Sequence, residues 1–352
     1  MKKYYSKLAN QITPYVAGEQ PQGREFIKLN TNENPYAPSP KVKVALKSVD
    51  FGRLKLYSDP ENVKLKTALA NAFNLQAENV FVGNGSDEVI AFCFPAFFDT
   101  DGAGIAFSDI TYSFYPVWAS LYNIKQVILP LKKDFSQDIA AYKSTNAQGI
   151  IIANPNAPTG IALKTQQIRE ILQANQDKIV IIDEAYTAFS EHSAVELIKE
   201  FDNLLVVQTF SKSYALAGIR CGYALGNPEL IAALTKIKHS FNSYTVNSVT
   251  ESLAVSAISD LAYYQKTAKK VIKTRNFVVK SLKMQGFKVL PSGANFIFAR
   301  PPAGNAAEIY QKLKDAGVLV RHFAKPKISE WLRISIGTKE DMQKFVEILQ
   351  NL

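Results

Sequence analysis

Residues 206–223 read VVQTFSKSYALAGIRCGY. The apolar start of this segment predicts a buried β-strand, which ends in hydroxyl residues and is followed at once by Lys212 and, eight residues later, by Arg220. Single cations just past a buried strand are either solvated loop charges or parts of a ligand site at the strand end. We favour the second interpretation, in which Lys212 bonds covalently to a ligand and Arg220 holds the negative charge of that ligand.

Apolar runs of the same kind recur along residues 60–230 and alternate with amphipathic segments. They read NVFVGNG (79–85), GAGIAFSD (102–109), QVILP (126–130), GIIIANPN (149–156), KIVIIDEAY (178–186) and CGYALG (221–226). Runs that are apolar throughout are typical of strands buried on both faces, and strand–helix alternation is typical of parallel sheets. The sequence therefore predicts an α/β fold with a mostly parallel central sheet sandwiched by helices.

The order of predicted helices and strands changes after about residue 228. Long helical stretches are followed there by short strands and further helices, which predicts a smaller α+β domain. We expect an N-terminal arm at residues 1–40 that joins the smaller domain, a large ligand-binding domain at 41–245, and the smaller domain at 246–352.

Composition disfavours several classes of protein. No apolar stretch approaches the ~20 residues that span a bilayer, and the N-terminus lacks the apolar core of a secretory signal. Cys93 and Cys221 form no C-x-x-C pattern and the three histidines have no metal-ligand spacing, so we expect a reducing, cytoplasmic location and no metal site. The net charge of +10 is dispersed, which favours small anionic substrates over nucleic acid.

Residues 83–88, GNGSDE, are the first candidate ligand site. They follow a predicted strand and precede an apolar helix, so the backbone N–H groups of Gly85, Ser86 and Asp87 would meet an anion at the helix N-terminus. The loop lacks the third glycine of a dinucleotide fingerprint and the Lys-Ser/Thr of a P-loop, which disfavours NAD and ATP. Taken alone, it is also typical of an ordinary turn capped by Ser86 or Asp87.

Asp183 is the second candidate, because it follows the aliphatic residues 179–182 at the end of a buried strand. A poorly solvated carboxylate has a raised pKa and calls for a cation, although an N-cap or a structural ion pair would also satisfy it. One strand separates Asp183 from Lys212, whose partly desolvated amine would be nucleophilic in the same crevice. An amine for an aldehyde, a carboxylate for a ring nitrogen and a phosphate cradle together indicate pyridoxal 5′-phosphate.

The chain resembles a known superfamily in five motifs: GNGSDE (83–88), NPNAPTG (154–160), DEAY (183–186), TFSKSYALAGIRCG (209–222) and LRISIGT (332–338). These are similar to motifs of the fold-type I pyridoxal-phosphate-dependent aminotransferases, and the likeness covers nearly the whole chain. Further stretches resemble the histidinol-phosphate aminotransferase family within class II: ITPY (12–15), LNTNENP (29–35), LYSDP (56–60), SFNSY (240–244) and GVLVRHF (317–323). The resemblance implies reversible transamination between L-histidinol phosphate and 2-oxoglutarate, giving imidazole-acetol phosphate and L-glutamate, in histidine biosynthesis.

The resemblance also implies roles for individual residues. Lys212 would bond the cofactor aldehyde and then shuttle a proton, Asp183 would pair with the ring nitrogen, and Tyr186 would bond the phenolic oxygen. The remaining cofactor contacts would be Ser86, Asp87, Thr209, Ser211 and Arg220 at the phosphate, Tyr112 against the ring, and Tyr57 reaching the partner subunit's cofactor in a homodimer.

For the substrates, the resemblance assigns the carboxylate of glutamate or 2-oxoglutarate to Arg333 and the phosphate of histidinol phosphate to Arg321. Tyr15 and Asn242 would line that pocket. Both arginines would otherwise be ordinary surface charges on strands. An aromatic amino-acid aminotransferase or a relative that decarboxylates phosphothreonine remains an alternative, whereas a catalytically idle scaffold would not need Lys212 and both arginines.

The motif NPNAPTG departs from the family pattern at one position. The family places an asparagine directly before PTG, where its amide bonds the phenolic oxygen of the cofactor, and this chain has Ala157 there. Asn154 or Asn156 would supply the amide, or Tyr186 would serve alone. We expect Asn156 to take part.

Overall fold

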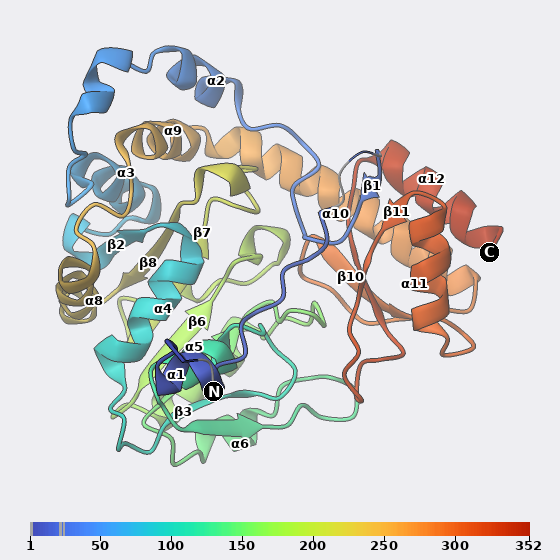
Figure 1. Ribbon diagram of the computed structural model, residues 1–352, viewed down its shortest axis with the longest axis horizontal. Coiled ribbons are helices and arrows are strands. Elements are labelled where there is room, and N and C mark those ends of the chain that lie inside the picture. The colour runs from blue at the N-terminus through green and yellow to red at the C-terminus, as the bar shows by residue number, and fades with distance from the viewer. Residues whose placement is uncertain (1–2, 21–22, 24) are drawn as a thin grey trace.

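The computed structural model describes residues 3–20, 23 and 25–352; residues 1, 2, 21, 22 and 24 of the expected arm lie outside the described residues. Within them the largest sheet has seven strands (Figure 1). In spatial order these are β2 (Val80–Gly83), β8 (Gly222–Gly226), β7 (Leu204–Thr209), β6 (Ile179–Asp183), β5 (Gly149–Ala153), β3 (Ile105–Ser108) and β4 (Gln126–Leu129). β8 is antiparallel to both neighbours and the other pairs are parallel, which confirms the α/β fold class.

Helices occupy much of the rest of the chain. The described α-helices are α1 (Lys7–Gln11), α2 (Pro40–Lys47), α3 (Val63–Phe73), α4 (Gly85–Phe97), α5 (Tyr115–Leu121), α6 (Ile139–Lys143), α7 (Thr165–Ala174), α8 (Pro228–Phe241), α9 (Ser248–Ile258), α10 (Leu261–Met284), α11 (Ala306–Asp315) and α12 (Lys339–Gln350). Short 3₁₀ turns are η1 (Phe51–Lys55), η2 (Ala77–Asn79), η3 (Thr187–Phe189), η4 (Ala194–Leu197) and η5 (Ala217–Ile219).

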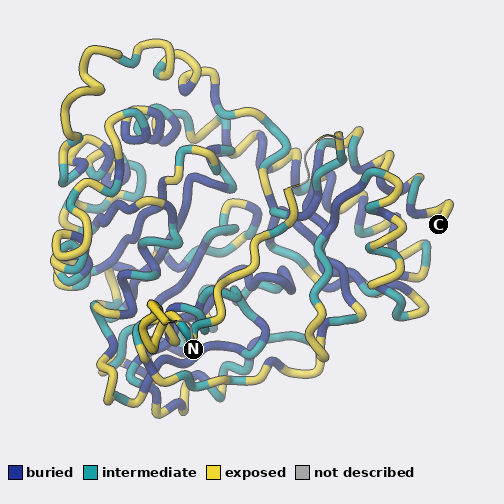
Figure 2. The backbone as a smooth tube through the Cα atoms, in the orientation of Figure 1, coloured by how far each residue is buried: buried dark blue, intermediate teal, exposed yellow. Residues whose placement is uncertain are grey.

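The side chains of the central strands alternate between two apolar layers. On one face, Val180 and Ile182 of β6 belong to a core shared with α3, α7 and α9. On the other face, Ile181 belongs to a core shared with α4, α5 and α8. Because helices cover both faces, every residue of β5, β7 and β8 is buried, as the dark strands of Figure 2 show. Ligands can therefore reach these strands only at their ends.

The smaller part of the molecule is built on an antiparallel sheet. Its strands lie in the order β12 (Arg321–His322), β13 (Leu332–Ser335), β10 (Phe296–Arg300) and β9 (Lys288–Val289). Helices α10, α11 and α12 supply the apolar residues that complete its core, among them Val271, Leu313 and Phe345.

The two apolar cores meet within α10, and the domain boundary between residues 245 and 246 stays a prediction. Helix α9 and the first turns of α10, as far as Tyr264, belong to the core of the large sheet. From Ala268 onward, α10 belongs to the core of the smaller sheet. The long helix therefore spans both bodies, as the orange ribbon of Figure 1 shows, and its buried residues run from Tyr264 to Leu282.

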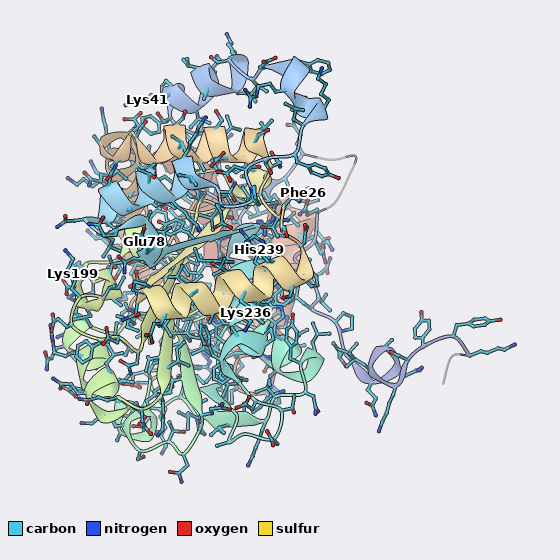
Figure 3. All side chains as sticks on the ribbon, turned by 90° about the vertical axis from the view of Figure 1, so that its left-hand side faces the viewer. Phe26, Lys41, Glu78, Lys199, Lys236 and His239 are labelled. Carbon is cyan, nitrogen blue, oxygen red and sulfur yellow. The ribbon has the colours of Figure 1, made fainter. Side chains whose placement is uncertain are left out.

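The N-terminal arm divides into two parts. Helix α1 has no buried residue and projects from the body of the molecule, at the right of Figure 3. Farther along, β1 (Ile27–Lys28) pairs in parallel with β11 (Val318–Leu319) of the smaller body. Residues 11–16 and Gly18 of the arm line the cavity described below.

No helix among the described residues is both long and apolar enough to cross a membrane. No group of three or more His, Cys, Asp or Glu side chains in that part of the chain is placed to hold a metal ion. Cys93 and Cys221 are free thiols in the core.

We expect Gly222→Ala to lower the free energy of unfolding by about 1–3 kcal/mol, as overpacking does. A Cβ at Gly222 would lie 2.2 Å from the backbone nitrogen of Ser86, which cannot retreat without disturbing the β2–β8 pairing and the start of α4. Gly218→Ala is the matched control, since nothing lies within 4 Å of its added Cβ. Urea denaturation measures both variants, and equal midpoints would contradict the packing described here.

Candidate active site

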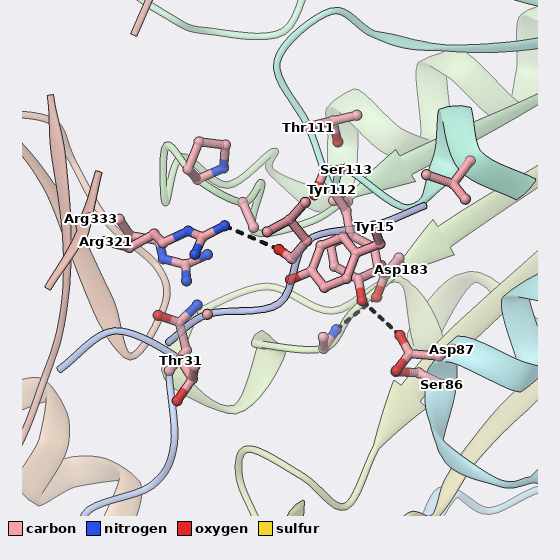
Figure 4. Close-up of a pocket in the computed structure, with 18 of the residues that line it drawn as sticks. Tyr15, Thr31, Ser86, Asp87, Thr111, Tyr112, Ser113, Asp183, Arg321 and Arg333 are labelled. Carbon is pink, nitrogen blue, oxygen red and sulfur yellow. Dashed lines mark hydrogen bonds between the residues drawn. The ribbon is translucent and has the colours of Figure 1, made fainter. Parts of the chain in front are cut away.

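A cavity of about 660 Å³ opens at the carboxyl ends of β5, β6 and β7, between the two bodies (Figure 4). It collects side chains that are distant in sequence. The sequence-predicted residues that line it are Tyr15, Ser86, Asp87, Tyr112, Asp183, Tyr186, Thr209, Ser211, Lys212, Arg220, Arg321 and Arg333. The strand ends therefore meet at one crevice, as the parallel sheet requires.

Lys212 presents an amine of lowered basicity to this cavity. Burial, followed by the positive charge of Arg333, lowers the pKa of Lys212 to about 8. Its Nζ donates one hydrogen bond of 3.0 Å, to the carbonyl oxygen of Thr31. The amide of Asn34 donates to the carbonyl oxygens of Lys212 and Ser213, which fixes the loop that carries the amine. The lowered pKa increases the neutral fraction of the amine near neutral pH, and the neutral form attacks carbonyl carbons.

Asp183 ends β6 with a buried carboxylate that lacks a cation. Tyr115 donates a hydrogen bond of 2.7 Å to Oδ2, and the backbone N–H of Ala185 donates one of 3.2 Å to Oδ1. Burial raises the pKa of Asp183 to about 6 despite these bonds. No ion pair within the described residues involves this carboxylate. A ligand with a protonated nitrogen would supply the missing positive charge.

A second group of side chains in the cavity forms a cradle for an anion. The hydroxyls of Thr209 and Ser211 lie 3.0 Å apart, and Arg220 Nη1 donates to Ser211 Oγ at 3.5 Å. Gly85 begins α4 with a φ of +84°, and a Cβ there would lie 2.5 Å from Arg220 Nη2. The glycine is thus required for the close approach of the guanidinium to the helix N-terminus, which itself attracts negative charge.

Asp87 connects this cradle to the aromatic wall. Its Oδ2 pairs with Arg220 Nη2 at 3.0 Å, and its Oδ1 accepts a hydrogen bond of 2.7 Å from the hydroxyl of Tyr112. The side chain of Asp87 therefore has a role in positioning Tyr112 and Arg220, beyond the backbone N–H that the sequence suggested.

Two arginines face the cavity from the smaller body. Arg333 lies between two aromatic rings, with its Cζ 5.5 Å from the centroid of Phe296 and 5.6 Å from that of Phe323. It donates through Nη2 to the carbonyl oxygen of Asn30 at 2.8 Å, while its buried Nε has no partner. Arg321 donates to the carbonyl oxygens of Val16 and Ala17 in the arm. Both guanidinium groups keep donors for an anionic substrate.

Four predicted residues do not line the cavity. Gly85 lies behind Arg220, whereas Tyr57 and Asn242 are exposed on the outer surface, where Tyr57 stacks on Tyr244. Asn156 is 1% exposed, and its amide donates to the carbonyl oxygen of Ile110 and to Thr159. The turn thus directs Asn156 away from the cavity and leaves Ala157 on the wall, so the structure does not bring Asn156 where we expected it.

Sequence reasoning missed several residues that hold the site. Tyr115 donates a hydrogen bond to Asp183, and the ring of Phe323 lies against both arginines. In the arm, Asn32 donates to Tyr186 and Asn34 donates to the loop that carries Lys212. The one available signal was the alternation of asparagine at positions 30, 32 and 34 in LNTNENP, which is unusual for a solvated arm. Tyr115 and Phe323 lie in ordinary apolar stretches and gave no signal.

Known proteins resemble this chain along nearly its whole length. A family profile described as "Aminotransferase class I and II" matches residues 24–349. The histidinol-phosphate aminotransferase of Clostridium botulinum (strain Okra / Type B1) is 49% identical over 352 residues, covering 100% of this chain and 99% of that protein. The protein of the same name from Brachyspira hyodysenteriae is 51% identical over 348 residues, covering 99% and 98%.

Solved structures show the same fold. The histidinol-phosphate aminotransferase of Sinorhizobium meliloti in complex with pyridoxal-5′-phosphate superposes with a TM-score of 0.88 at 24% identity, covering 99% of this chain and 98% of that chain. That of Clostridium acetobutylicum gives 0.84 at 24% identity, covering 92% and 98%.

We expect the reaction of Lys212 with an aldehyde to follow a pKa of about 8. The folded pKa lies below that of the unfolded chain, so the neutral nucleophile is lost only as the pH falls through about 8. Pyridoxal 5′-phosphate, borohydride trapping and peptide mapping across the pH range measure it. Labelling at Lys212 should rise about tenfold per pH unit up to that pH and then level off. A continued tenfold rise per unit well above pH 8 would contradict the lowered pKa, and Lys212→Arg is the control that removes this label.

Proposed function

This chain belongs to the class I and II aminotransferases, and from that premise we propose that it transfers an amino group reversibly between L-histidinol phosphate and 2-oxoglutarate, giving imidazole-acetol phosphate and L-glutamate. The observation that carries the proposal is one cavity that contains the Lys212 amine, the cation-free carboxylate of Asp183, an anion cradle and two arginines. Identity of 49% to a histidinol-phosphate aminotransferase along the full chain supports the substrate. The reaction belongs to histidine biosynthesis, and we place the enzyme in the cytoplasm.

The residues present fit pyridoxal 5′-phosphate as the cofactor. Thr209, Ser211, Arg220 and the α4 N-terminus at Ser86 would hold its phosphate, since they form the anion cradle. Asp183, Tyr112 and Tyr186 would meet its ring nitrogen, ring face and phenolic oxygen, respectively. When bound, the group supplies an aldehyde that takes up amino groups and a protonated ring that withdraws electrons.

The chain's own residues then carry the proton transfers. Lys212 Nζ, with a pKa near 8, takes the proton from the α-carbon of the amino substrate and returns it to the carbon that receives the amino group. Asp183 would keep the ring nitrogen protonated, because a buried carboxylate is stabilised by a cation at hydrogen-bond distance. Tyr186 would donate its hydroxyl proton toward the phenolic oxygen.

Two separate arginines suit two different anions. Glutamate carries a carboxylate beside its reacting carbon, and Arg333, buried with its Nε unpaired, is placed for a bidentate contact with it. Histidinol phosphate carries a phosphate instead, and Arg321, which also lines the cavity, is available for that group. Tyr15, stacked on Phe114 with centroids 4.2 Å apart, would bring an aromatic surface to the imidazole. The same surface favours an aromatic amino acid as the second candidate substrate.

We further propose a homodimer in which Tyr57 and Asn242 serve the partner's cavity. Both residues are exposed and remote from the cavity of their own chain. Exposed apolar side chains gather in the projecting arm, where Tyr4 is 88% exposed, and around η1, where Phe51 is 84% exposed. A second copy of the chain would cover these surfaces.

Arg321→Gln should impair the reaction with histidinol phosphate and spare glutamate. Loss of a charge-assisted contact with the phosphate should raise its half-saturation concentration about 10–100-fold. Arg333→Gln should show the opposite selectivity. The measurement is the change from the pyridoxal to the pyridoxamine absorbance spectrum as each amino donor is added to the holoenzyme.

The same assay with unmodified enzyme tests the proposed reaction itself. Histidinol phosphate should convert the spectrum at lower concentration than phenylalanine, and phosphothreonine should release no carbon dioxide. Absence of any spectral change with histidinol phosphate would reject the proposal, and preference for phenylalanine would favour the second candidate.

The dimer is tested by sedimentation. We expect the holoenzyme to sediment at twice the chain mass of 39.0 kDa. Deletion of residues 1–10 should weaken the dimer, because it removes the exposed apolar side chains of the arm. Removal of the tyrosine hydroxyl by Tyr57→Phe should weaken binding of the cofactor without changing the mass. A monomer at micromolar concentration would contradict the dimer.

A further inference from the structure

We propose that Asn32 and Ser335 form a hydrogen-bond relay that fixes the hydroxyl of Tyr186 as a donor into the cavity. The relay joins the arm, the end of β13 in the smaller body and the loop after β6 in the large one. It rests on the proposed function, because its consequence concerns the phenolic oxygen of pyridoxal 5′-phosphate. Asn32 and Ser335 act on the phenolic oxygen only through Tyr186, whose hydroxyl they position.

The direction of the hydrogen bonds in the relay follows from the backbone N–H of Asn32, which can only donate. The backbone N–H of Asn32 donates to Ser335 Oγ at 2.8 Å. Ser335 Oγ in turn donates its single proton to Asn32 Oδ1 at 2.9 Å, so the other end of the amide is the NH₂ group. Asn32 Nδ2 donates to the hydroxyl oxygen of Tyr186 at 2.9 Å. The proton of Tyr186 is therefore free to be donated to a second acceptor, and the cavity is where a ligand supplies one.

The reverse orientation of the amide would be unfavourable. It would aim Nδ2 at Ser335 Oγ, which already accepts a hydrogen bond from the backbone N–H of Asn32. The hydroxyl proton of Ser335 would also lose its acceptor, Asn32 Oδ1. Ser335 is 3% exposed and Asn32 is 1% exposed, so water cannot easily replace a lost bond. Asn295 donates to the carbonyl oxygen of Asn32 at 2.9 Å, which satisfies its remaining backbone group.

The backbone of Asn32 supports the same placement. Its φ is +54°, a left-handed conformation that asparagine tolerates better than other residues with a side chain. This conformation lets the backbone N–H and the side-chain Oδ1 of one residue meet the same hydroxyl. The relay thus depends on asparagine for both its backbone and its amide.

The relay matters because the wall of the cavity lacks another amide at this place. Ala157 lines the cavity, and the amide of Asn156 is engaged by Ile110 and Thr159. Tyr186 is then the donor for the phenolic oxygen, and Asn32 acts on that oxygen through Tyr186. Asn32 thereby does indirectly what an asparagine at position 157 would do by direct contact.

The surroundings of Tyr186 determine how the relay can be measured. The charged or titratable groups that interact with it are Arg333, Asp183, Tyr15, Tyr112 and Lys212, whose Nζ lies 5.9 Å from the ring centroid. Burial raises the pKa of Tyr186, and the positive charge of Arg333 and the amide of Asn32 oppose that rise. The hydroxyl therefore keeps its proton at neutral pH, as a donor must.

Asn32→Asp reverses the relay at nearly constant shape. Once ionised, the introduced carboxylate has only acceptors, so it takes the proton of Tyr186 and withdraws it from the cofactor. A donor to the phenolic oxygen stabilises its negative charge, so losing the donor makes the holoenzyme hold its titrating proton more tightly. We expect the pH midpoint of the visible absorbance change to rise by about one unit, a tenfold change in proton affinity.

A double-mutant cycle separates the relay from the added charge. In the Tyr186→Phe background, Asn32→Asp keeps its charge but has no hydroxyl to act upon, so we expect the shift to fall by half or more. The dissociation constant of pyridoxal 5′-phosphate is a second readout and should show the same non-additivity. Equal shifts in the two backgrounds would overturn the relay.

Two uncharged variants keep the test decisive if Asn32→Asp does not fold. Asn32→Gly accepts the positive φ and removes the amide, and Ser335→Ala removes the group that orients the amide. Both should raise the midpoint in the Tyr186 enzyme by less than Asn32→Asp does and leave it unchanged in the Tyr186→Phe enzyme. Unchanged midpoints in both backgrounds would overturn the relay, even where the unmodified enzyme converts histidinol phosphate and the proposed function stands.

Discussion

The burial of the Asp183 carboxylate without a cation is the constraint on which the rest of the site depends. The carboxylate ends a strand in the interior of the sheet, where burial raises its pKa to about 6 and two donors only partly compensate. A negative charge in such a place is costly unless a positive charge meets it. Because the chain's described residues provide no ion-pair partner, the site is built around a cation that a ligand must bring.

The other functional groups take their places around that carboxylate. The Lys212 amine is on the next strand connection, and the anion cradle lies where α4 begins. The segment 30–34 of the arm then contacts these groups from the cavity side, through the carbonyl of Thr31 at Lys212 and the amide of Asn32 at Tyr186. Ser335 of the smaller body is hydrogen-bonded to Asn32 of this segment. The position of the smaller body therefore affects the positions of the Lys212 amine and the Tyr186 hydroxyl through hydrogen bonds.

The sequence was informative where chemistry coincides with local pattern. Asp183 and Lys212 each follow an apolar run typical of a buried strand, so their place at the sheet edge could be predicted. Arg220 follows the 3₁₀ turn η5 instead, so no strand pattern places it. Asn156 could not be placed, because the direction of an amide in a turn depends on partners such as Ile110 that lie 46 residues away. The sequence does not show which core α9 and the first turns of α10 join, because only packing tells which body a buried helix face contacts. The contact between Asn32 and Ser335 spans 303 residues, and no local pattern encodes it.

We expect Asp183 to keep the ring nitrogen of bound pyridoxal 5′-phosphate protonated, and the nitrogen NMR shift of the ring-labelled cofactor on the enzyme measures this. The ring nitrogen should be protonated at neutral pH in the unmodified enzyme and unprotonated in Asp183→Ala. An unprotonated nitrogen in the unmodified enzyme, or the same shift in both proteins, would contradict it.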